Sequence, residues 1–200
     1  MRTCHPARAA QPAWRVTNLT CLALALLWTA CTLPDRSGDT EYEPAGEKPQ
    51  GTELVAVYIG SSTCAPCQTP ELKAAIRQMK DELSRRAEGE GRRFYAIGVA
   101  LDWSIEDGME LLRSTATFDE ILVGRNWLNT GAIEHIWSDP GTRQLIPQVI
   151  VFEREVRWGS QEIELGPKRV LRRVGGGGEI SEWVEAGAPL SADPAPAGGA

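Results

Sequence analysis

The sequence predicts an α/β domain, in which long apolar strands alternate with amphipathic helices. Two apolar runs, residues 54–59 and 94–101, have the composition of strands buried on both faces. Between them, apolar side chains recur at helical spacing, at Leu72, Ala75, Ile76, Met79 and Leu83. A strand, a helix and a second strand make a right-handed parallel crossover the default connection.

Length, composition and charge limit what this domain does. The chain has 200 residues, of which 42% are hydrophobic, enough for one domain with a core of its own. Its formal net charge is -6, so we expect no nucleic acid among its partners.

The N-terminus has the form of an export signal. Arg2, Arg8 and Arg15 precede the apolar run 19–31, which is shorter than the ~20 residues of a spanning helix. Residues 27–31 resemble a bacterial lipoprotein box, which implies that Cys31 is lipidated and becomes the mature N-terminus. An uncleaved signal anchor and ordinary cleavage are the alternatives. Each places the domain on the extracytoplasmic side of a bacterial membrane, in the cell envelope.

The predicted organisation therefore begins with a leader over residues 1–30. An acidic, Gly- and Pro-containing tether follows over 31–51, then a domain over 52–187 and a disordered Ala/Pro/Gly-rich tail over 188–200. Within the domain, after the strand at 94–101, we expect a helix at 105–113, a strand at 118–123 and a helix at 127–137 interrupted by Thr130-Gly131. A strand at 146–152, a hairpin or loop at 157–167, a strand at 169–174, a flexible turn at 175–178 and a closing helix complete it.

Two cysteines, Cys64 and Cys67, lie where the first strand meets the helix. A helix start favours the thiolate of the first, and the second, one turn along, can close a disulfide. Half of a zinc site and an inert pair are the other interpretations. A structural zinc site needs four ligands, and the remaining cysteines and histidines form no second pair: Cys4, Cys21, Cys31, His5 and His135. A redox pair is therefore favoured, with no metal and no cofactor.

These residues resemble the thioredoxin-like superfamily, most closely its envelope-tethered, TlpA-like thiol-disulfide oxidoreductases. The resemblance rests on Cys64-Ala65-Pro66-Cys67, on Ile146-Pro147 opening a later strand, and on the final strand-Gly-helix unit. It implies a thioredoxin-like fold, with a central mixed sheet flanked by helices. It also implies a helix-strand-helix insertion, between Trp103 and Trp137, before the cis-proline strand.

The resemblance also implies roles. Cys64 would be the exposed nucleophile and Cys67 the resolving thiol, with Ala65 and Pro66 between them and Pro66 tuning the potential. Pro147 would be a cis-proline facing the pair. The backbone of Ile146 would hold an extended substrate segment by strand addition.

Three positions depart from the family pattern. Thr63 stands where thioredoxins commonly have Trp, and Tyr58 stands where they have a buried Asp. Pro70 stands where many TlpA-like proteins have Glu, with Glu71 one place later. Glu71 is therefore the candidate proton acceptor for Cys67, although one step along a helix turns a side chain by about 100°.

The leading functional hypothesis is a membrane-tethered thiol-disulfide oxidoreductase that exchanges with protein thiols or disulfides and with an unidentified redox partner. A copper chaperone on the same fold is an alternative that needs a histidine near the pair, whereas we expect His135 to be an exposed helical residue. A non-catalytic binding module is the other. The Ala-Pro dipeptide between the cysteines does not fix the direction of electron flow.

Overall fold

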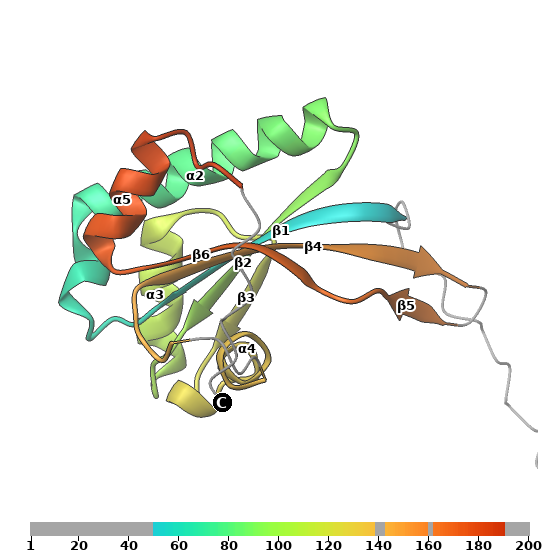
Figure 1. Ribbon diagram of the computed structural model, residues 1–200. Helices are drawn as coiled ribbons and strands as arrows, with labels where there is room; N and C mark the ends of the chain where they lie inside the picture. The colour runs from blue at the N-terminus through green and yellow to red at the C-terminus, as the bar shows by residue number, and fades with distance from the viewer. Residues whose placement is uncertain (1–49, 139–142, 160–161, 191–200) are drawn as a thin grey trace, which may run out of the picture. The chain divides into compact units, whose positions relative to one another are not determined.

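A computed structural model of the protein describes residues 50–138, 143–159 and 162–190 (Figure 1). Strand β1 (Gly51–Gly60) is central to a six-stranded sheet, with β2 (Arg93–Ala100) parallel to it on one side and β4 (Gln148–Trp158) antiparallel on the other. The mixed sheet of the predicted fold class is confirmed.

The outer strands complete the sheet on both sides. Strand β3 (Glu120–Val123) pairs in parallel with β2. On the far side, β4 is long enough to pair with two strands, β6 (Arg169–Gly175) along its first half and β5 (Ile163–Leu165) along its second. The strand predicted at 146–152 therefore begins at Gln148 and continues to Trp158. Its end forms a hairpin with β5, one of the two alternatives predicted for 157–167.

Helices cover the two faces of the sheet unequally. Helices α2 (Pro70–Gly89), α3 (Ile105–Thr115) and α5 (Gly177–Glu185) contribute to one core layer, with Leu54, Ala56 and Tyr58 of β1. The alternate β1 residues form the other layer with the short α4 (Thr130–Ala132) and the π-helical turn η3 (Ile133–Trp137). Figure 1 shows α2 and α5 on one face and α4 on the other. Burial of β1 on both faces, predicted from its apolar run, is confirmed.

The predicted helix at 127–137 differs from the structure at its start. A 3₁₀ turn, η2 (Asn126–Leu128), comes first, and α4 begins at Thr130, where we expected an interruption. The Asn129 side chain caps α4 by accepting a bond from Gly131 N at 2.8 Å. Gly131 is needed because a Cβ there would lie 2.7 Å from Val99. The pair that signals a break in sequence is thus the first turn of the helix.

At the C-terminal end, Gly177 and Gly178 belong to α5 and not to a flexible turn. Packing continues to Leu190, past the boundary at 187 expected from composition. Ala188 is fully buried, and Trp183 Nε1 donates to Pro189 O at 3.1 Å.

Other sequence predictions fall outside the described residues. The leader over 1–30, Cys31, nearly all of the tether over 31–51, and residues 191–200 of the predicted tail lie there. Within the described ranges, no helix combines the length and the apolar character that crossing a membrane requires.

Candidate active site

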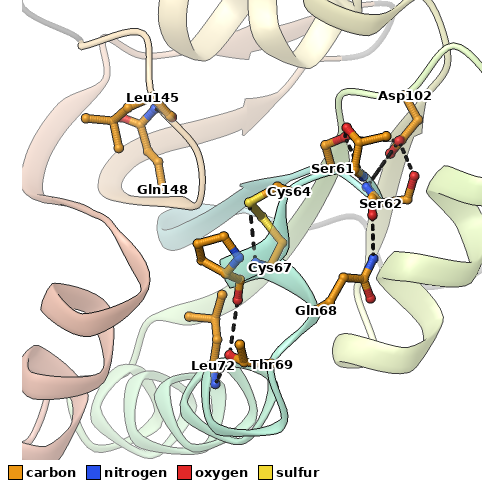
Figure 2. Close-up of a disulfide and its surroundings, with 12 residues drawn as sticks. Ser61, Ser62, Cys64, Cys67, Gln68, Thr69, Leu72, Asp102, Leu145 and Gln148 are labelled. Carbon is orange, nitrogen blue, oxygen red and sulfur yellow. Dashed lines mark hydrogen bonds between the residues drawn. A yellow bond between two sulfur atoms is a disulfide. The ribbon is translucent and has the colours of Figure 1, made fainter.

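Cys64 and Cys67 are joined by a disulfide just beyond the end of β1, with their Cα atoms 5.2 Å apart (Figure 2). The two residues differ in exposure. Cys67 is completely buried and packs in the core layer under α2, whereas Cys64 is partly exposed. Ala65 and Pro66 between them are exposed. The surroundings are therefore asymmetric, with one cysteine partly exposed and the other shielded.

The prediction that the cysteines sit at the start of the long helix is wrong in one respect. They belong to a separate 3₁₀ turn, η1 (Ala65–Gln68), and α2 begins only at Pro70. A proline disfavours helical geometry in the residue before it, and Thr69 is extended, with φ -69° and ψ 139°. Thr69 Oγ1 caps α2 by accepting from Leu72 N at 3.3 Å. The dipole of α2, which acts within its first turn, is thus centred beyond the cysteines.

A different backbone group reaches Cys64. The Cys67 N–H is shared between Cys64 O, at 3.0 Å, and Cys64 Sγ, at 3.3 Å (Figure 2). A donor aimed at a sulfur stabilises the negative charge of a thiolate more than it stabilises a neutral thiol. The local 3₁₀ turn therefore places a backbone donor at Cys64 Sγ, where we had expected the N-terminus of the long helix.

The predicted cis-proline, Pro147, is connected to this turn by contacts at the start of α5. The Ile146-Pro147 peptide bond is cis, and Pro147 is buried. Pro147 O accepts from Gly176 N at 2.8 Å, and a Cβ on the next residue, Gly177, would lie 3.4 Å from Pro66 Cβ. Figure 2 draws Leu145 and Gln148 in the surroundings of the disulfide. These two residues flank the partly buried Ile146 and the buried Pro147. The structure thus brings Ile146-Pro147 and the turn of residues 64–67, the CAPC turn, to one region of the protein.

The proton acceptor for Cys67 gains no support from the position of Glu71. Glu71 is exposed in the first turn of α2, whereas Cys67 is fully buried. Tyr58, at the position of the family's buried Asp, lies in the same core layer as Cys67. Its hydroxyl is directed along β1 toward Gly60, where a Cβ would lie 2.6 Å from it. Burial raises the pKa of the Tyr58 phenol, so this group stays protonated and cannot replace a carboxylate base.

One residue of the site was missed by sequence reasoning. The Asp102 side chain is buried and accepts hydrogen bonds from Ser61 and Ser62, in the turn that precedes Cys64 (Figure 2). A signal was present in the sequence. If the two apolar strands are parallel, their carboxyl ends meet at one edge, and the polar residues that follow each strand become neighbours.

His135 is buried, not exposed as predicted. Only 5% of its surface is accessible, and its ring stacks on Phe152 with centroids 6.0 Å apart. Burial, together with the nearby Lys168 cation, lowers the pKa of His135 to about 4. Phe152 belongs to the core layer on the opposite face of the sheet from Cys67, so His135 and the cysteine pair pack against different faces of the sheet. Among the described residues, no group of three or more His, Cys, Asp or Glu side chains could hold a metal ion.

Comparison with known proteins gives similarity in structure only. No protein-family model matches the chain, and no curated protein matches its sequence. A thioredoxin-family thiol:disulfide interchange protein from Chlorobium tepidum TLS is a similar solved structure, with 11% identity, a TM-score of 0.34, and coverage of 74% of this chain and 100% of that one.

Two further structures are similarly distant. For DsbF of MTB the identity is 12% and the TM-score 0.33, with 68% of this chain and 81% of that chain covered. For BsSco, of the Sco family of cytochrome c oxidase assembly proteins, the identity is 15% and the TM-score 0.30, with 68% of this chain and 80% of that chain covered. With identities and TM-scores this low, the activity of this chain has to be inferred from its own site.

Proposed function

We propose that the protein is a thiol-disulfide oxidoreductase that exchanges electrons with protein thiols or disulfides through Cys64 and Cys67. The observation that carries this proposal is the unequal exposure of the bonded pair, with Cys64 partly exposed and Cys67 fully buried. A disulfide that only stabilised the fold would not need a partly exposed cysteine next to the exposed Ala65 and Pro66. Exchange requires one, because the partner sulfur must approach along the S–S axis.

The exchange proceeds in two displacement steps. In the reducing direction, the Cys64 thiolate attacks one sulfur of a partner disulfide, which breaks that bond, forms a mixed disulfide and releases the partner's first thiolate. The Cys67 thiolate then attacks Cys64 Sγ, which restores the Cys64–Cys67 bond and releases the partner's second thiolate. Two electrons pass from the protein to the partner, and the same steps in reverse oxidise a dithiol.

The surrounding residues suit these steps. The Cys67 N–H, which lies 3.3 Å from Cys64 Sγ, favours the attacking thiolate. The backbone of the partly exposed Ile146, before the cis Pro147, is where we place an extended partner segment, in the manner of strand addition. Ala65 and Pro66 form the exposed surface over which that segment would pass.

A copper chaperone is less well supported. Such a site needs a third ligand near the pair, and His135 lies in the other core layer with Phe152 against its ring. We further propose that the domain works on the extracytoplasmic side of a membrane, tethered through a lipidated Cys31 or an uncleaved anchor. This rests on the arginines and the apolar run of residues 2–31.

Single-cysteine variants test the exchange and the roles of the two thiols. Cells producing Cys67→Ser or Cys64→Ser are treated with an alkylating agent, and their proteins are separated without reductant. The proposal predicts reducible high-mass adducts on Cys67→Ser, because the mixed disulfide on Cys64 can no longer be resolved, and none on Cys64→Ser. Adducts on Cys64→Ser alone would reverse the two roles. No adducts on either variant, with wild-type thiols permanently reduced, would favour a non-catalytic binding module.

A further inference from the structure

A buried carboxylate holds the turn that leads into Cys64. Asp102 follows β2, and because β2 runs parallel to β1, its side chain lies beside the residues that follow β1. Leu101 N donates to Gly60 O at 2.8 Å, which fixes the two strand ends together. Only 4% of Asp102 is exposed, so its charge is largely removed from water.

Among the residues that the structure describes, the hydrogen bonds to this carboxylate come from two adjacent serines. Oδ1 accepts from Ser61 Oγ at 3.0 Å, from Ser62 N at 3.1 Å and from Ser62 Oγ at 2.5 Å. Oδ2 accepts from Ser62 N at 3.1 Å. Burying an ionised carboxylate is costly unless such bonds replace its hydration. Here they all fall on one turn, so the stabilisation that they provide is available only when that turn has this conformation.

The turn passes this constraint on to Cys64. Ser61 Oγ accepts from Thr63 N at 3.2 Å and lies 2.9 Å from Thr63 Oγ1. Cys64 N donates to Ser61 O at 3.1 Å. A continuous set of bonds therefore runs from Asp102 through residues 61–63 to the backbone of the partly exposed Cys64. Figure 2 shows the first part of it, between Asp102 and the two serines.

We propose that Asp102 is a positioning residue for thiol-disulfide exchange, which acts by fixing the 61–63 turn so that Cys64 is presented to its partner. The inference rests on the proposed function. It assigns Asp102 no contact with the partner and no proton transfer. A misplacement of reacting atoms by about 1 Å can lower a rate a hundredfold, so loosening this turn should reduce exchange even when the fold is retained.

The test uses the reduced full-length protein with Cys4, Cys21 and Cys31 replaced by Ser, so that only the Cys64–Cys67 pair can react. It measures, as a function of pH, the rate of reaction with dithiodipyridine, a small neutral disulfide. The limiting rate constant at high pH, where Cys64 is fully ionised, no longer depends on its degree of ionisation. A change in its pKa then acts only through the nucleophilicity of the thiolate, by about threefold per pKa unit, so a larger change reports on the presentation of the sulfur. We expect Asp102→Ala to lower this constant about tenfold or more. Asp102→Asn, whose carbonyl still accepts from the serine hydroxyls, should recover part of the loss, and Ser62→Ala should give a smaller reduction at unchanged charge.

Asp107→Asn is the matched control. Asp107 is exposed and lines the same groove as Ser62, and its replacement removes the same charge without touching the turn. Its rate constant should stay within about twofold of wild type, because an exposed charge is screened by solvent. If Asp102→Ala does not fold, as judged by circular dichroism, the comparison of Asp102→Asn with Asp107→Asn decides.

Equal limiting rate constants for wild type and both Asp102 variants would overturn the inference and leave the proposed function standing. A wild-type protein that shows no exchange, although its thiols are reduced and accessible to alkylation, would overturn the proposed function itself, and the inference with it.

Discussion

Replacing Tyr58 with Phe should stabilise this protein, although Tyr58 is a fully buried core residue. Its ring stacks on Phe118 with centroids 6.2 Å apart and planes 8° from parallel. Its hydroxyl is also buried, and within the described residues it has no hydrogen-bond partner. The substitution removes the hydroxyl and leaves the ring and its packing in place.

The magnitude follows from the cost of leaving that hydroxyl unpaired. A buried polar group without a partner is destabilising by about 1–3 kcal/mol, relative to an apolar group of the same shape. Tyr58→Phe should therefore raise the free energy of unfolding by about 1 kcal/mol or more. For a domain of this size, each kcal/mol corresponds to roughly 3–5 °C in Tm.

Urea denaturation of the oxidised protein, followed by circular dichroism, measures this change. Tyr95→Phe is the control, because Tyr95 is only partly buried and its hydroxyl can reach water; we expect a change within about 0.5 kcal/mol. A loss of 1 kcal/mol or more in Tyr58→Phe would refute the reasoning. It would show that the hydroxyl makes a stabilising hydrogen bond in the folded protein.

Two further predictions concern other parts of the chain. The pKa of His135 lies near 4 in the folded protein, below its ordinary value of 6.5, so the stability linked to its neutral form is present above about pH 6.5 and is lost as the pH falls toward 4. The charged groups that act on His135 are Glu134, Lys168, Arg154 and Arg173. His135→Gln should remove up to about 3 kcal/mol of this pH dependence of the free energy of unfolding. An unchanged pH profile would contradict the assignment. Cys31→Ser should release the protein from membranes or block its processing; unchanged fractionation and gel mobility would count against lipidation.

The sequence predicts the elements that surround the cysteine pair well, because the signals are local and strong. The run 54–59 is apolar throughout, as a strand buried on both faces must be, and the CAPC turn follows it directly. The resemblance implied the cis bond before Pro147, and the structure has it. Both features depend on residues that are adjacent in the chain.

Features that depend on distant contacts were harder to predict. Asp102 becomes part of the site only because β1 and β2 end at the same edge of the sheet, 40 residues from Ser62. His135 is buried in part because its ring stacks on Phe152, which lies on β4. Periodicity within the helical segment of His135 does not reveal that contact. The start of α2 could have been predicted from the sequence, since Pro70 disfavours helical geometry in the residue before it.

The equilibrium between the dithiol and disulfide forms of the purified protein tests the central claim most directly. The protein is equilibrated in glutathione buffers of graded ratio, its free thiols are alkylated, and the two forms are separated by mass, with Cys64→Ser as the control that should show no transition. A reversible Cys64–Cys67 redox pair predicts one two-electron transition at a potential above about -300 mV, where exchange-active disulfides lie. A pair that stays oxidised in every buffer would be a structural disulfide, and that result would contradict the proposed function.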